Sequence, residues 1–175
     1  SAFMPTADGE SFFAASGSNI QHFHDGSWVL VSGGKKSCIY FGKSRIPLLI
    51  NQGKETTGAN SIAVNPADNN QVFIVGGDFK QDTAQTGNSL LVQINPFTQK
   101  TPAVPPHGYR SCVEYISGKQ MICCGTTGVD ISSDGGLHWR LISNMSFHVC
   151  RKSKSGNAVF LAGSQGKIAV WQPGF

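Results

Sequence analysis

The fold is decided by the stretch Ser132-Ser133-Asp134-Gly135-Gly136-Leu137-His138-Trp139, which runs directly into the strand-like Arg140-Leu141-Ile142. Its pattern is Ser-x-Asp-x-Gly-x-x-Trp. Asp134 can accept hydrogen bonds from backbone N–H groups two or three residues further on, and Gly136 tolerates a positive φ because it has no Cβ. Trp139 is then the first large residue of the following strand. The stretch therefore predicts a self-capped β-hairpin.

The composition predicts a single all-β domain. A chain of 175 residues can bury a sizeable core. Only 14% of the residues are charged while 21 are glycine, a balance typical of short strands and tight turns. No window of helical length shows a 3.6-residue apolar period. The net charge of +4 comes from scattered residues, so no basic stripe points to nucleic acid.

A repeat recurs along the chain. Four apolar runs each end at a glycine. Continuous apolar runs of this kind predict strands that are covered on both faces. The glycines lie at intervals of about 40–50 residues, the length of a four-stranded propeller blade. The closing glycines are Gly33, Gly76, Gly125 and Gly163. The sequence thus predicts a β-propeller, whole or partial, of four blade-like antiparallel units, with approximate limits 12–50, 61–104, 110–143 and 147–175.

Within each unit the buried run is expected to be the second strand. Third strands are predicted at residues 37–41, 88–94, 128–132 and 167–171, and outer strands at 46–50, 101–104 and 139–142. The last unit lacks an outer strand, which residues 1–4 or a partner chain would supply. Residues 12–17 form a further apolar run, either an elongated inner strand or the remnant of a preceding blade.

The hairpin pattern matches the Asp-box, formed here by Ser132, Asp134, Gly136 and Trp139. Together with residues 33–36, 53–61 and 75–78, it resembles bacterial propellers related to the photosystem II stability/assembly factor. The resemblance implies a longer parent ring, of which this chain is the C-terminal half, and an extracytoplasmic setting, either periplasmic, secreted or as a lipoprotein. Relatives are often labelled oxidoreductases, but this sequence has no dinucleotide-binding, Cys-x-x-Cys or haem-attachment motif.

Asp-boxes also occur in sialidases, so a glycan-acting enzyme is the alternative function. Such an enzyme needs three arginines to clamp a carboxylate, a tyrosine nucleophile and further carboxyl groups. Residues 44–47 echo the Arg-Ile-Pro motif of sialidases, although Ser44 replaces the usual aromatic. The four arginines are Arg45, Arg110, Arg140 and Arg151, and ordinary strand positions explain them better.

No residues predict a catalytic, cofactor or metal site. His22 and His24 share a face of one strand but have no third ligand at a suitable spacing. The five cysteines sit in apolar runs and are expected to be buried thiols, with one disulfide from Cys112 to Cys123 or Cys124 as an alternative. Adjacent cysteines on a strand should point to opposite faces.

The leading hypothesis is a non-catalytic scaffold that binds a protein or peptide, with a role in the assembly or stability of another complex. Loops that enter inner strands line one face of a propeller and commonly bind partners. The candidate loop residues are Lys35, Lys36, Lys54, Glu55, Asn60 and Arg110. No stretch approaches a membrane span. Half a ring would leave apolar blade faces open, which predicts a homodimer through those faces.

Overall fold

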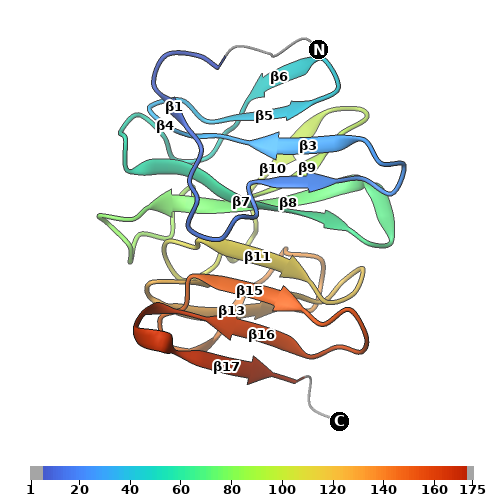
Figure 1. Cartoon of the computed structure of the whole chain (residues 1–175). Coiled ribbons are helices and arrows are strands. Elements are labelled where there is room, and N and C mark those ends of the chain that lie inside the picture. Colours follow the sequence, from blue (N-terminus) through green and yellow to red (C-terminus); the bar gives the residue numbers. More distant parts are fainter. Residues whose placement is uncertain (1–5, 173–175) are drawn as a thin grey trace.

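The computed structural model describes residues 6–172. The predicted closing strand at residues 1–4 lies outside them. The described chain contains no α-helix, only a 3-10 turn at Ser164–Gly166, and its strands form four antiparallel sheets (Figure 1). The all-β prediction is therefore confirmed.

Apart from two short segments at residues 10–11 and 33–34, which join the second sheet, the four sheets follow one another along the chain. The first has the order β2-β3-β5-β6, the second β1-β4-β7-β8-β9-β10, the third β11-β12-β13-β14 and the fourth β15-β16-β17. Strands of the first sheet are β2 (Ile20–His22), β3 (Trp28–Val31), β5 (Cys38–Phe41) and β6 (Ser44–Pro47). Those of the second are β1 (Glu10–Ser11), β4 (Gly33–Gly34), β7 (Thr57–Asn65), β8 (Asp68–Asp78), β9 (Ser89–Gln93) and β10 (Thr98–Lys100). The third and fourth contain β11 (Cys112–Tyr115), β12 (Met121–Gly125), β13 (Gly128–Ser132), β14 (Arg140–Ser143), β15 (Val149–Lys152), β16 (Val159–Ala162) and β17 (Ile168–Trp171).

Three of the four glycine-terminated runs, β3, β12 and β16, are second in the order of their sheets, and the fourth, β8, follows the inner strand β7 in the same way within the six-stranded second sheet. β8 and β12 are buried on both faces where they are apolar, because their sheets pack between two others, whereas β3 and β16 belong to the first and last sheets and expose Trp28 and Phe160 on the outer side. In β8 and β12, alternate side chains enter the cores on the two sides of the sheet. The equivalent placement of the four runs is the regularity that a propeller requires.

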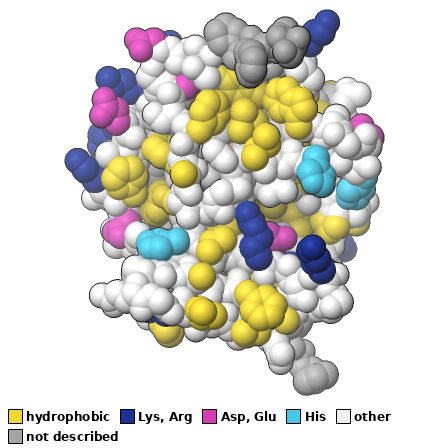
Figure 2. Space-filling model, viewed as in Figure 1, with side chains coloured by type: hydrophobic (Ala, Val, Ile, Leu, Met, Phe, Trp, Pro, Cys, Tyr) yellow, Lys and Arg dark blue, Asp and Glu magenta, His cyan; other side chains and the backbone are white. Residues whose placement is uncertain are grey.

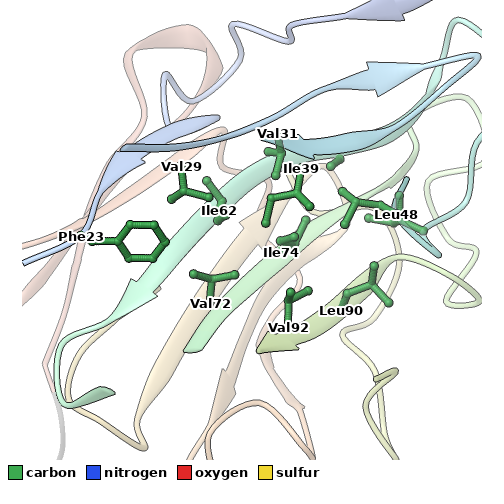
Figure 3. Packing of buried hydrophobic residues seen from close by; sticks show 12 residues of the cluster. Phe23, Val29, Val31, Ile39, Leu48, Ile62, Val72, Ile74, Leu90 and Val92 are labelled. Atoms are coloured by element: carbon green, nitrogen blue, oxygen red, sulfur yellow. The ribbon is translucent and has the colours of Figure 1, made fainter. Parts of the chain in front are cut away.

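Three hydrophobic clusters fill the spaces between consecutive sheets. The first lies between the first and second sheets, where Val29 and Ile39 face Ile62 and Ile74 (Figure 3). The second surrounds Phe73, Met121 and Trp139, and the third surrounds Ile122, Phe147 and Leu161. Every buried strand thus contributes to stability through burial of apolar side chains, at about 25 cal/mol per Å² removed from water.

The cysteines behave as small buried hydrophobes. All five are free and buried. Cys123 belongs to the core between the second and third sheets, whereas Cys124 belongs to the core between the third and fourth, so the two point to opposite faces as predicted. Cys112 lies opposite Cys124 across the β11–β12 pair, yet the disulfide considered from sequence is not formed.

The sheets differ from the predicted units at their margins. The second sheet has six strands because β1 and β4 extend it beyond β7, where Gly33 pairs with Gly58. A Cβ on Gly58 would lie 2.4 Å from the Cα of Gly33, so this crossing needs glycine. Residues 12–17 form no strand at all. They provide neither an elongated inner strand nor a remnant of a blade.

Two outer strands begin earlier than the sequence predicted. The outer strand of the second sheet is Thr98–Lys100 rather than 101–104, because a tight turn at residues 95–97 returns the chain at once onto β9. Val104 instead makes an isolated bridge with His138. In the first sheet β6 ends at Pro47, since Leu48 and Ile50 leave the ladder to fill the first core.

Candidate functional site

The four innermost strands, β2, β7, β11 and β15, line the middle of the molecule. The labelled β11 and β15 run from left to right in Figure 1. We call the side at which the chain enters these strands the entry face, and the opposite side the exit face. The predicted partner-binding loops belong to the entry face, because they precede β7 and β11 or follow β3.

The lysines of these loops are exposed and partly paired with acids. Lys35 Nζ lies 3.5 Å from Glu55 Oε1, and both side chains are largely in solvent. Lys54 Nζ lies 3.4 Å from Asp78 Oδ2, a carboxylate that is almost fully buried. Lys36 is also exposed. Figure 2 shows basic and acidic side chains gathered along the left edge, where the entry face lies. These four loop residues are available to a partner.

Arg110 is not on the surface, unlike the prediction for a contact residue. Its guanidinium is completely buried and bonds Asp130 through Nε, 2.7 Å from Oδ2, and through Nη2. Nη1 donates to the Thr127 hydroxyl at 2.8 Å. His107 Nδ1 lies 2.7 Å from the other oxygen of Asp130, and its ring is partly exposed. Arg110 therefore holds the entry loops in position from below.

Asn60 is buried as well. Its Oδ1 accepts a hydrogen bond from the Tyr109 hydroxyl at 3.0 Å. Nearby, the Asn88 side-chain amide donates to the carbonyls of Pro106 and Gly108 at 2.7 and 2.8 Å. Side-chain bonds to loop backbone replace the ladder bonds that loops lack. Asn60, Tyr109 and Asn88 thus extend the buried polar frame that Arg110 and Asp130 begin.

Sequence reasoning missed an aromatic residue on this face. Phe79 is 43% exposed and directly follows the buried Asp78. Its ring makes edge contacts with Phe13 and Tyr109, with centroids 6.5 and 6.3 Å away, and its N–H donates to Thr56 O at 3.2 Å. A phenylalanine within the polar run 76–82 was the available signal. Phe79 thus contacts Tyr109 of the buried frame, and its neighbour Asp78 is paired with Lys54.

The exit face carries a cleft. It has a volume of about 480 Å³ and opens where the inner strands end, and its lining includes His22, His24, Tyr115, Glu114 and Lys152. The two histidines are exposed. Burial raises the pKa of Glu114, while Arg151, 3.3 Å away, opposes the shift. Among the described residues Glu114 is the only carboxyl that lines this cleft, so it lacks the pair of carboxyls that a glycosidase uses.

The four arginines lie on separate elements. Arg45 is on the outer strand β6, where it contacts Glu10 at 3.3 Å and the Tyr40 hydroxyl at 3.1 Å. Arg140 is on the outer strand β14, and Arg151 is on the innermost strand β15. Arg110 is enclosed by Asp130. They do not form the arginine clamp of a sialidase.

The turn from Ser132 to Trp139 has a network of internal hydrogen bonds. The Ser132 hydroxyl accepts from the Gly136 N–H at 3.0 Å, and Asp134 Oδ1 accepts from the N–H groups of Leu137 and His138 at 3.1 and 3.0 Å. Trp139 Nε1 donates to Gly136 O at 3.0 Å. Its ring packs on Phe73, 5.3 Å between centroids. The hairpin is thus capped from within, and it fastens the third sheet to the second.

Within residues 6–172, no three His, Cys, Asp or Glu side chains come together as a metal site. The same residues contain no helix with the length and apolar character needed to cross a membrane.

No family model and no curated protein matches this sequence. Among solved structures, the chain is similar to "YCF48 bound to D1 peptide", with a TM-score of 0.59 and 16% sequence identity. The match covers 90% of this chain and 52% of that one, so this chain spans about half the length of its structural neighbour. At this identity the similarity shows the fold alone: the four face-to-face sheets are those of a β-propeller.

Proposed function

We propose that this chain is a non-catalytic scaffold that binds a protein or peptide partner through its entry face. The observation that carries the proposal is Phe79, an exposed aromatic ring among Lys35, Lys36, Lys54 and Glu55 on loops that a buried polar frame supports. Aromatic side chains that are flanked by polar groups are the usual centres of binding energy at interfaces. The surrounding charges would orient the partner.

The buried pair of Arg110 and Asp130 supports this reading. A buried ion pair contributes little net stability compared with a well-packed apolar pair, so stability alone is a weak reason for it to be there. What it does provide is a fixed arrangement of the loops around Tyr109 and Phe79. A preformed surface loses less conformational entropy when a partner binds.

Several more specific parts of the proposal rest on the resemblance of the sequence to propellers related to the photosystem II stability/assembly factor. The capped turn at Ser132–Trp139 is proposed to be an Asp-box, and the chain to be the C-terminal half of a longer ring in an extracytoplasmic protein. A role in the assembly or stability of another complex completes the hypothesis. The structural neighbour is YCF48 bound to a D1 peptide, which supports a peptide as the first ligand class to test. The glycan-acting alternative has less support, because the exit-face cleft has one carboxyl and that carboxyl is paired with Arg151.

The test is a selection of a random peptide library on the immobilised chain, followed by measurement of the affinity of the enriched peptides. We expect Phe79→Ala to weaken the binding of these peptides at least tenfold, which corresponds to about 1.4 kcal/mol of binding free energy. Trp28→Ala is the matched control, because Trp28 has a similar exposure of 40% but lies at the exit-face end of β3. Peptides that bind equally well to both variants and to the wild type would contradict the proposal.

A further inference from the structure

The ring of His107 is fixed from below by the buried ion pair of Arg110 and Asp130. Its Nδ1 lies 2.7 Å from Asp130 Oδ1, and its backbone N–H donates to Oδ2 of the same carboxylate at 3.3 Å. Arg110 donates to that carboxylate through Nε and Nη2. The Thr127 hydroxyl in turn donates to His107 O at 2.8 Å. Both the ring and the main chain of His107 are therefore held in one position.

The bond to Asp130 decides which ring nitrogen of the neutral histidine carries the proton. A carboxylate that is ion-paired with Arg110 offers only acceptor atoms, so Nδ1 must carry the proton and donate it. In that tautomer Nε2 has a lone pair and can only accept a hydrogen bond. The fold thus presets the outer nitrogen of His107 as an acceptor.

This acceptor is open to solvent. The His107 side chain is 38% exposed, and within residues 6–172 its ring is bonded through Nδ1 alone. Among the same residues, the buried side-chain N and O atoms that lack a hydrogen-bond partner belong to Tyr115 and Thr126. Nε2 has no partner and is not one of these buried atoms. It is therefore accessible to a bound molecule.

His107 lies on the same part of the entry face as Phe79, because their two loops are bonded together. Asp82 O, three residues after Phe79, accepts from the Tyr109 N–H at 2.7 Å. A Cβ added to Gly108, which follows His107, would collide with that same oxygen. The Tyr109 ring also contacts Phe79, with 6.3 Å between centroids. A ligand that covers Phe79 therefore meets the neighbouring acceptor as well.

The charges of the entry loops favour a neutral donor at this acceptor. The charged side chains already described there are Lys35, Lys36, Lys54, Glu55 and Asp78. Three lysines against two carboxylates leave an excess of positive charge, which disfavours a cationic donor. A carboxylate would set its own lone pairs against that of Nε2. A hydroxyl or an amide N–H meets neither obstacle.

We propose that His107 selects the partner, with Nε2 accepting a hydrogen bond from a hydroxyl or an amide N–H of the bound peptide. A peptide without a donor at this point would cover Nε2 and leave it unpaired, which is costly and so provides specificity. This inference rests on the proposed binding function and names the chemistry that the entry face recognises.

The first measurement needs no partner. Long-range ¹H–¹⁵N spectra of the imidazole rings, recorded above the pKa of histidine at about pH 8, distinguish the two tautomers. We expect the proton of His107 to be on Nδ1. His22, an exposed histidine of the exit face, serves as the reference for a ring in solvent. A proton on Nε2 of His107 would overturn the proposal, because that atom would then be a donor.

Two substitutions separate recognition from a merely structural role. Asparagine can keep the donor to Asp130 at the place of Nδ1 but has no atom at the place of Nε2, whereas glutamine can put its amide oxygen there. With library peptides that depend on Phe79, we expect His107→Asn to weaken binding at least about tenfold and His107→Gln to weaken it less than about threefold. A structural role predicts the reverse order, since asparagine keeps the bond to Asp130. The reverse order, or equal losses, would contradict the proposal.

His138→Asn is the matched control for these variants. His138 Nδ1 also lies 2.7 Å from a carboxylate oxygen, that of Asp134, and its side chain is 60% exposed. It lies at the exit-face end of β13, away from the entry loops. We expect His138→Asn to leave the affinity of the peptides unchanged, and urea denaturation to show that all three variants are folded.

The donor on the peptide is identified by changing the peptide. Each Ser, Thr, Asn and Gln side chain is replaced by Ala, and each backbone N–H is replaced by N-methyl. One replacement should weaken binding to the wild type at least about tenfold and have little effect on binding to His107→Asn, since the two changes remove the same hydrogen bond. A set of replacements in which none is coupled to His107 in this way would overturn the proposal.

The outcomes distinguish this inference from the proposed function. Peptides that depend on Phe79 but bind His107→Asn as tightly as the wild type would overturn the inference and leave the entry-face proposal intact. If the selected peptides do not depend on Phe79, the entry-face proposal fails, and the role of His107 in selecting a partner fails with it.

Discussion

Arg110 and Asp130 form a completely buried ion pair, in which the guanidinium Nε lies 2.7 Å from the carboxylate Oδ2. The pair lies beneath the entry face and joins the start of β11 to β13. Because the same carboxylate also holds His107, its position fixes two loops at once. The exposed residues proposed to bind a partner therefore depend on charges that never reach the surface.

Removal of one member of this pair should be costly. Arg110→Ala leaves Asp130 buried without its counter-charge, and we expect the free energy of unfolding to fall by about 3–5 kcal/mol. Urea denaturation measures the change. Arg140→Ala, an exposed arginine on β14, is the control and should stay within about 0.5 kcal/mol of the wild type. A loss below about 1 kcal/mol for Arg110→Ala would show that the pair does not hold the loops.

The two glycines of the capped turn offer a matched comparison. Both have a positive φ, +77° at Gly135 and +91° at Gly136, so alanine is strained at either position. Only at Gly136 does an added Cβ meet another side chain, the Phe73 ring at 2.3 Å, whereas Gly135 has open space. We expect Gly136→Ala to cost about 1–3 kcal/mol more than Gly135→Ala in thermal or urea unfolding. Equal losses would mean that the turn does not pack on the second sheet.

Because of Glu10, we expect the stability of the folded chain to depend on pH in the acid range. Burial alone would raise its pKa, but hydrogen bonds from Cys38, Tyr40, the Ala7 N–H and Ser32 lower the pKa to about 2 from 4.5. A depressed pKa means that the folded state favours the charged form, so the stabilisation is full above pH 4.5 and is lost as the pH falls towards 2. Glu10→Gln should therefore lower stability at pH 7 and flatten the change between pH 4.5 and 2. A variant with an unchanged acid profile would exclude this role.

The apolar faces of the first and fourth sheets predict self-association. Ile20 and Trp28 are exposed on the first sheet, and Phe160 and Ile168 on the fourth. Exposed apolar groups of this kind mark contact surfaces or promote aggregation. We expect sedimentation equilibrium to give a mass that rises with concentration from 18.6 kDa towards twice that value. The double variant Phe160→Ser/Ile168→Ser should reduce this rise, and a constant monomer mass in the wild type would contradict the prediction.

Much of the fold could be predicted because its signals are local. The glycine-terminated runs identify β3, β8, β12 and β16, and in β8 and β12 the continuous apolar run reflects burial on both faces of the strand. The turn at Ser132–Trp139 could be read from spacing, because its hydrogen bonds join residues within four positions of one another. The outer strands could not be placed as well, because short polar strands resemble loops and their register depends on turn geometry.

The candidate site was only partly predictable. The entry loops were found from their position before the inner strands, but the sequence does not distinguish Lys54, which is exposed, from Arg110, which is buried. That difference depends on Asp130, twenty positions away along the chain and on another strand. Phe79 was missed because a single aromatic in a polar loop is as compatible with burial as with exposure. Its position follows from contacts with Phe13 and Tyr109, which only the folded chain brings together.

The central claim is that the entry face binds the partner. The most direct test is to titrate a library-selected peptide into the ¹⁵N-labelled chain and map the amide signals that move. The proposal predicts that they cluster at residues 34–36, 54–60 and 78–80, with Lys54→Ala and Phe79→Ala both weakening the complex. Signals that move instead around His22, Glu114 and Lys152, in the cleft of the exit face, would contradict it.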